Sequence, residues 1–211
     1  YSGGVSTCGG AGPNNATGGG SGTAWLIGSD RPTGELRVSN CGMADGGRTP
    51  LWVPLPGTPS LVVDSSATLE LEGSHVFDRA TILGGAKVTH QPAATLPTTS
   101  GVNIHVIDRM TIEASGSVTA DGKGYGAGGG PGGAPNGVHY ASGGSHAGAG
   151  GVGWNSGIGW VPVNLTTYGS PTAPTTFGSG GGTAPNAGVS GGPGGGAVRL
   201  VVDGQLTVDG T

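Results

Sequence analysis

A five-residue motif recurs along this chain in a constant local context. Asp78-Arg79-Ala80-Thr81-Ile82 returns 30 residues later as Asp108-Arg109-Met110-Thr111-Ile112, and Val-Thr follows each copy at 88–89 and 118–119. Weaker copies run over 61–69 and 200–208. Short repeats separated by insertions of variable length are typical of solenoids, in which a repeat buries its apolar face only against its neighbours. The repeat therefore predicts stacked coils.

The local pattern is that of strands. Apolar and polar residues alternate over 102–106, and Leu69 and Leu71 alternate with Glu70 and Glu72, which places both glutamates outward. No window has helical spacing of its apolar residues. We predict an all-β fold, a small right-handed parallel β-helix with long glycine-rich, polyproline-II-like insertions. An antiparallel sandwich is the alternative, although it does not explain the recurrence of the motif.

The composition changes along the chain and suggests four stretches. Residues 1–59 are expected to be glycine-rich and irregular, 60–121 to form the coils, 122–196 to be a glycine-rich insertion, and 197–211 to supply the final strands. We expect these stretches to make one structural unit.

Glycine accounts for 50 of the 211 residues, and the segment from Gly124 to Val198 contains no Asp, Glu, Lys or Arg. Disordered segments usually carry charge. A loose surface loop is one interpretation, but we favour ordered packing of extended glycine segments, whose bare backbones can approach closely. Aromatic anchors would hold them in place: Tyr125, Tyr140, Trp154, Trp160 and Tyr168.

The two cysteines, Cys8 and Cys41, are interpreted as a disulfide, with two free thiols as the alternative. A bridge of this span stabilises a fold by about 3–4 kcal/mol in the chain-entropy model and is typical of secreted proteins. Asn15 and Asn164 begin Asn-X-Thr sequons, so a glycoprotein is expected.

Charge and motifs argue against several functions. The few basic residues are scattered, which argues against nucleic-acid binding, and no apolar run is long enough for membrane insertion. Most carboxylates belong to turns, to the repeat or to outward strand positions, which leaves Asp30, Glu35 and Asp45 without a structural assignment. In stacked repeats, Asp78 and Arg79 would form a charge ladder with Asp108 and Arg109 at a corner. We therefore predict no catalytic, cofactor-binding or metal-binding residues, and no enzyme.

Residues 101–126 and 197–211, together with the loop Gly143-Gly144-Ser145-His146, resemble large secreted glycine-rich repeat proteins of bacterial cell surfaces. In those proteins, units like Leu206-Thr207-Val208-Asp209-Gly210 alternate with such loops. The resemblance implies a β-helical protein at the cell surface, and it brings no catalytic residues.

The leading hypothesis is an extracellular filament or surface-layer subunit that binds copies of itself. The last strand has no polar cap, so Leu206 and Val208 are the expected assembly residues. An adhesin that binds glycans on Trp154, Trp160 and Tyr168 is the alternative, and a β-helical enzyme acting on polysaccharide is a third.

Overall fold

The fold is all-β, as predicted. The computed structural model describes residues 5–10, 12, 18–43, 47–64, 66–93, 101–137, 140–155, 159–161 and 163–210. Within these residues there are strands, one single-turn 3-10 segment, η2 (Pro185–Ala187), and no α-helix. The chain divides into two compact units. Unit 1 comprises Tyr1–Thr89, Val102–Thr119 and Leu200–Thr211, and unit 2 comprises His90–Gly101 and Ala120–Arg199.

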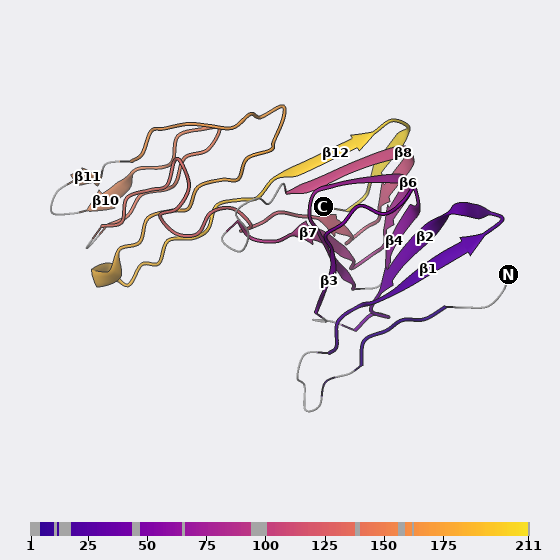
Figure 1. The fold of residues 1–211 in the computed structure, drawn as a ribbon. Coiled ribbons are helices and arrows are strands. Elements are labelled where there is room, and N and C mark those ends of the chain that lie inside the picture. Colours follow the sequence, from indigo (N-terminus) through magenta and orange to yellow (C-terminus); the bar gives the residue numbers. More distant parts are fainter. Residues whose placement is uncertain are drawn as a thin grey trace. The chain divides into compact units, whose positions relative to one another are not determined.

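Unit 1 is built on two sheets of mainly parallel strands (Figure 1). The first follows the order β1-β2-β4-β6-β8-β12, with β13 also on β8, and the second follows β3-β5-β7-β9. From β2 to β9 the chain alternates between the sheets, and β1 alone is antiparallel to its neighbour among the registers observed in unit 1. The strands of the first sheet are β1 (Gly22–Gly28), β2 (Arg31–Ser39), β4 (Ser60–Asp64), β6 (Ser74–Ile82), β8 (Val102–Ile112), β12 (Val198–Val202) and β13 (Gln205–Val208), and those of the second are β3 (Arg48–Leu51), β5 (Thr68–Leu71), β7 (Lys87–His90) and β9 (Ser117–Val118).

The core of unit 1 consists of apolar rows that cross the strands. Leu61, Ala80 and Met110 are partners in one row, and Val63, Ile82 and Ile112 form the next. All six side chains are buried. Because the two full motif copies occupy β6 and β8, their residues 79–82 and 109–112 pair in register. Each row is therefore one position of the strand pattern repeated from strand to strand.

Two details of the repeat differ from the sequence interpretation. The weak copy at 61–69 aligns through Leu61–Val63 opposite Ala80–Ile82, so Asp64 is not the equivalent of Asp78. Asp78 and Arg79 also do not lie at a corner. They lie within β6, where the register with β8 shifts between Phe77 and Arg79, because a β-bulge occupies that position.

The N-terminal part is more regular than its sequence indicates. β1, β2 and β3 all fall within 1–59, which the composition predicted to be irregular. The alternation of these strands is interrupted by Pro32, Gly34 and Pro50. Parallel pairing of β2 with β4 and of β3 with β5 nevertheless holds them in extended conformation. Glu70 lies on the opposite face of β5 from the buried Leu69 and Leu71, as the alternation predicts, but it is not exposed to solvent. It is 5% exposed and accepts from Arg48 on β3, at 3.1 Å.

Unit 2 contains extended glycine segments joined by backbone hydrogen bonds. The segment 178–182 bonds to three others: Gly178 N to Gly195 O (2.8 Å), Gly180 N to Gly129 O (2.9 Å) and Gly182 N to Ser142 O (2.9 Å). The segments 124–129 and 191–195 also bond to each other, through Gly194 N and Tyr125 O at 2.9 Å. A strand in a sheet has at most two neighbours, so this arrangement is a bundle of segments.

Close approach in this bundle requires glycine at particular positions. A Cβ added at Gly194 would overlap the backbone of Gly178, and one added at Gly180 would overlap Gly126. Gly192 and Gly195, on the same segment as Gly194, have open space at the Cβ position. Unit 2 also contains a small antiparallel hairpin, β10 (Gly153–Asn155) with β11 (Gly159–Val161).

Truncation of a core side chain should destabilise unit 1 strongly. Phe77 on β6 is fully buried, whereas its neighbour Val76 is 39% exposed on the opposite face. We expect Phe77→Ala to lower the free energy of unfolding by about 3–5 kcal/mol, and Val76→Ala by less than about 1 kcal/mol. Urea denaturation measures both, and equal losses would contradict this placement of the core.

A second matched pair of variants tests the close packing of the glycine bundle. Gly194→Ala places a methyl group against the Gly178 backbone and should cost about 1–3 kcal/mol as an overpacked contact. Gly195→Ala should be neutral or slightly stabilising, because alanine restricts the unfolded chain. Amide hydrogen exchange at Gly178 and Tyr125 reports on the bundle directly. Equal protection in the two variants would show that the segments are not closely packed.

Candidate functional site

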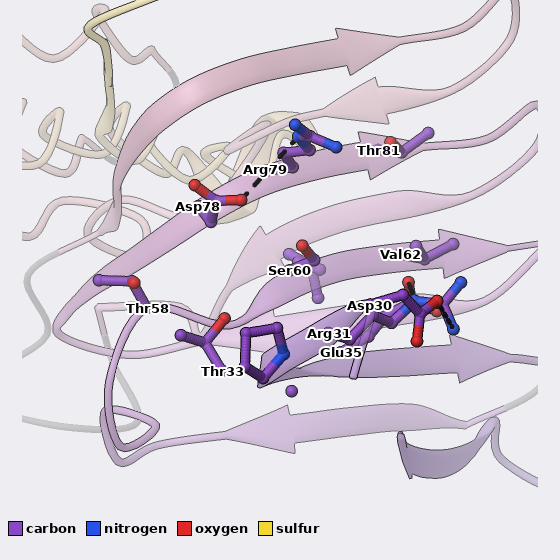
Figure 2. Close-up of a pocket in the computed structure, with 13 residues that line it drawn as sticks. Asp30, Arg31, Thr33, Glu35, Thr58, Ser60, Val62, Asp78, Arg79 and Thr81 are labelled. Atoms are coloured by element: carbon purple, nitrogen blue, oxygen red, sulfur yellow. Dashed lines mark ion pairs between the residues drawn. The ribbon is translucent and has the colours of Figure 1, made fainter. Parts of the chain in front are cut away.

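A polar groove of about 570 Å³ lies over β2, β4 and β6 of the first sheet (Figure 2). Its lining carries hydroxyl groups, three carboxylates and two guanidinium groups, with no aromatic ring. The hydroxyls belong to Thr33, Thr58, Ser60 and Thr81, the carboxylates to Asp30, Glu35 and Asp78, and the guanidinium groups to Arg31 and Arg79. Parallel pairing of β2, β4 and β6 brings these residues together from three separate turns of the chain.

At the β2 side of the groove, one arginine is held by two acids. Arg31 Nε donates to Glu35 at 3.0 Å, and Arg31 Nη1 lies 3.5 Å from Asp30. Glu35 is nearly buried, whereas Asp30 is exposed. The Glu35 carboxylate is therefore fixed by its neighbour and by the sheet, because it lies on β2 opposite Ser60 of β4.

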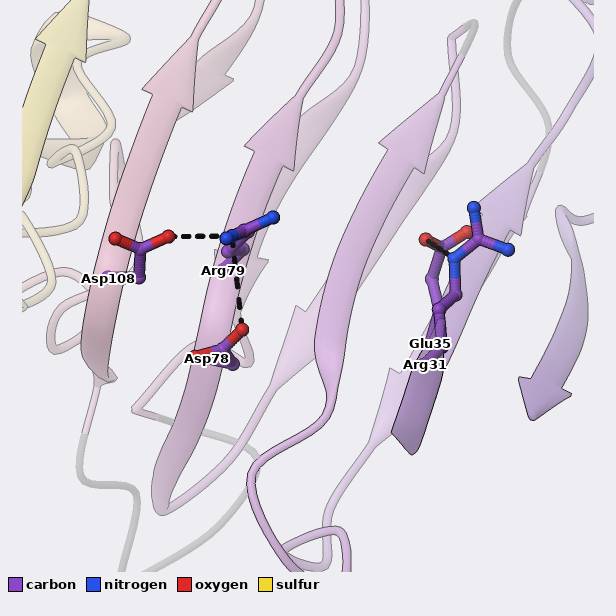
Figure 3. A network of polar contacts seen from close by, with 5 residues as sticks. All are labelled: Arg31, Glu35, Asp78, Arg79 and Asp108. Carbon is purple, nitrogen blue, oxygen red and sulfur yellow. Dashed lines mark hydrogen bonds and ion pairs between the residues drawn. The ribbon is translucent and has the colours of Figure 1, made fainter. Parts of the chain in front are cut away.

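At the β6 side, Arg79 links two acids of the repeat (Figure 3). Its Nε donates to Asp108 at 2.7 Å and lies 3.9 Å from Asp78. The hydrogen bond and negative charge of Asp108, followed by the charge of Asp78, raise the pKa of Arg79 above its ordinary value. Among the described residues nothing bonds to its two terminal nitrogens, so these remain available to a ligand.

The two edges of the first sheet carry exposed apolar side chains. At one edge, Leu206 pairs with Met110 and Val208 with Ile112, so both extend the buried rows. They are nevertheless 48% and 53% exposed, because no described strand covers the outer edge of β13.

At the opposite edge, β1 presents Trp25 (39% exposed) and Ile27 (71%). Trp25 pairs with the buried Leu36 of β2, so it too extends a buried row. Trp52 and Val53, which follow the edge strand β3 of the second sheet, are also exposed. Neither β1 nor β13 contains a charged residue, although charge is a common protection of edge strands.

A disulfide joins Cys8 to Cys41, with their Cα atoms 5.4 Å apart. It ties the N-terminal segment to the end of β2. Such a bridge is compatible with an extracellular protein. No helix among the described residues is long and apolar enough to span a membrane.

The predicted aromatic anchors have different environments. Tyr168 donates from its hydroxyl to the Phe177 carbonyl at 2.5 Å, lies 2.6 Å from Ser179 Oγ, and packs edge-on against His146 at 4.8 Å. Burial raises its pKa. Tyr125 packs edge-on against Phe177, and Tyr140 is half-buried. Trp160 is 69% exposed on β11, where its register partner is Trp154.

The two sequons begin at Asn15 and Asn164. Asn15 lies outside the described residues. The Asn164 amide nitrogen donates to the carbonyls of Pro131 (3.4 Å) and Gly133 (3.3 Å). Attachment of a glycan at Asn164 would therefore have to displace internal hydrogen bonds.

Sequence reasoning left Asp30 and Glu35 without a structural role and assigned Asp78 and Arg79 to a charge ladder. The sequence did not predict that these four residues lie close together, because Pro32 and Gly34 interrupt the strand alternation of β2, and its register with β4 does not follow from the sequence.

In the part of the chain that the structure describes, no three His, Cys, Asp or Glu side chains could jointly hold a metal ion. Comparison with protein-family models, with curated proteins and with solved structures found no match.

The core histidine of β6 gives a test of pH dependence. His75 is 1% exposed, and its Nε2 donates to the Glu72 carbonyl at 2.8 Å. Burial lowers its pKa below the ordinary 6.5. The unfolded chain therefore binds a proton that the folded chain does not, and stability should fall as the pH drops below about 6.5.

We expect His75→Gln, which keeps an N–H donor, to lose less stability than the parent protein between pH 7.5 and pH 5. The difference in slope is at most about 1.4 kcal/mol per pH unit for one proton. Urea denaturation at each pH measures it, and parallel pH profiles of the two proteins would rule out this role of His75.

Proposed function

We propose that this chain is an extracellular structural protein that polymerises head to tail through the first sheet of unit 1. The observation that carries the proposal is the pair of uncharged edges, β1 and β13, each with large apolar side chains exposed in continuation of buried core rows. Adding a strand at such an edge satisfies backbone hydrogen bonds and buries the row at the same time.

In this proposal unit 1 is a small right-handed parallel β-helix. The regular alternation of the chain between two parallel sheets supports a helical path. Connections between parallel strands are right-handed in nearly all proteins, which supports the handedness. The glycine segments of unit 2, which bond to several neighbours each, are inferred to be polyproline-II-like, because a threefold backbone directs its groups to more than two sides.

The geometry of the joint follows from the strand directions. β13 is parallel to β8, and through β6 and β4 to β2, whereas β1 is antiparallel to β2. When one copy is stacked on the next by translation, β13 of the first runs antiparallel to β1 of the second. The contact uses different surfaces on the two copies and does not close, so it produces a filament.

The repeat of that filament can be estimated. The first sheet has six strand positions between β1 and the layer that holds β12 and β13. Strands in a sheet are spaced by about 4.8 Å, so each copy should add about 29 Å along the axis. The exposed Trp160, Leu165 and Val152 of unit 2 are proposed to pack filaments laterally.

The test uses two variants that each block one edge. Ile27→Lys alters only the β1 edge and Leu206→Lys only the β13 edge, and both residues are exposed, so the fold should be retained. The parent protein should form filaments with an axial repeat of about 29 Å in electron micrographs. Each variant alone should stay monomeric in analytical ultracentrifugation, and an equal mixture should form dimers that grow no further.

A matched control is Val76→Lys, because Val76 is exposed on β6, which pairs with β4 and β8 and with neither edge strand. This variant should polymerise like the parent. A parent protein that remains monomeric, or blocked variants that do not pair, would refute the head-to-tail joint.

An adhesin is the second candidate, favoured by the exposure of Trp160. In that case Trp154, Trp160 and Tyr168 would contact a glycan. The hydrogen bonds of Tyr168 inside unit 2 argue against its availability. A monomeric parent protein that loses glycan binding on Trp160→Ala would support this candidate over the filament.

A further inference from the structure

The polar groove over β2, β4 and β6 has the size of a ligand site but an unusual lining. Its volume of about 570 Å³ falls within the range of about 300–1,000 Å³ that is typical of small-molecule sites. Such sites are usually lined by apolar and aromatic side chains. Here polar and charged groups dominate, and no aromatic ring is available to stack on a nucleobase or a flat cofactor.

The charges in the groove are nearly balanced. Three carboxylates face two guanidinium groups, and both arginines are already paired with acids. A strongly anionic ligand such as a phosphate would meet excess negative charge, and an isolated cation would meet the two arginines. The balance favours a neutral ligand.

The hydrogen-bonding groups identify the chemistry of that ligand. Carboxylates only accept, the terminal nitrogens of Arg79 only donate, and the hydroxyls of Thr33, Ser60 and Thr81 do both. A sugar hydroxyl also donates and accepts, so a row of them can satisfy all three kinds of group. Bonds to charged partners are the stronger ones, and Arg79 is held in place by Asp108.

We propose that this groove binds a short stretch of neutral oligosaccharide, with Arg79 and Asp78 on one side and Arg31 and Glu35 on the other. The site lies on the outer face of the sheet and does not depend on assembly at the β1 and β13 edges. A glycan held there would attach the protein to a polysaccharide, and either proposal can fail without the other.

The repeat supplies matched controls for this site. Arg109 pairs in register with Arg79, and Thr111 with Thr81, one coil further along. Neither Arg109 nor Thr111 lines the groove. Arg79→Ala and Arg109→Ala therefore remove the same side chain from equivalent strand positions, and Thr81→Val and Thr111→Val do the same for a hydroxyl.

The experiment is isothermal titration calorimetry of the full chain. The probes are hexasaccharides of β-1,4-glucose, α-1,4-glucose and β-1,4-N-acetylglucosamine, with hexagalacturonate as an anionic comparison. At least one neutral probe should bind, and Arg79→Ala should weaken it about tenfold or more, as expected for loss of a charge-assisted hydrogen bond. Thr81→Val should weaken it less, and Arg109→Ala and Thr111→Val should leave it unchanged.

Three results would overturn the proposal. One is that no neutral probe binds at millimolar concentration. Another is that Arg79→Ala and Arg109→Ala have the same effect, which would place binding elsewhere. The third is that hexagalacturonate binds more tightly than every neutral probe, which would contradict the inference from the balance of charge.

Discussion

The structure of unit 1 depends on one constraint, namely that an apolar row on a strand is buried only by the strands above and below it. Val63, Ile82 and Ile112 are buried because each has a neighbour in the row. Val208 occupies the next place and is half exposed, because no described strand follows it. Burial of apolar surface contributes about 25 cal/mol per Å². The same rows that stabilise the interior therefore leave apolar surface exposed at the edges.

Unit 2 satisfies the same physical requirement in a different way. Its glycine segments have few side chains to bury, so their backbone groups bond to neighbouring segments instead, as Tyr125 does with Gly178 and Gly194. Side chains enter where they fill the space between segments. Tyr168 and Phe177 do so, and the Tyr168 hydroxyl is hydrogen-bonded. The absence of charge from 124 to 198 fits this packing, because a charged group there would be costly to desolvate.

The two faces of the first sheet have separate roles. Residues of the motif that point inward, such as Ala80 and Ile82, are buried and pack against the neighbouring strands. Those between them, Arg79 and Thr81, contribute to the polar groove on the outside. Because a strand alternates its side chains between faces, one repeated motif supplies both a core and a polar surface. Changes to the groove can therefore leave the core intact.

Alternation and a repeated motif depend on local residue order, so the sequence was enough to predict the all-β class and the pairing of β6 with β8. It also identified Cys8 and Cys41 as the candidates for a disulfide. Only the structure shows that β1, β2 and β3 are strands. Proline and glycine interrupt the alternation of these segments in the sequence, and hydrogen-bonded pairing with neighbouring strands makes them regular. The tertiary structure decided the burial of Glu70, which depends on Arg48 of a neighbouring strand. It also created the groove, because register between distant segments is what brings Glu35 and Arg79 to one surface.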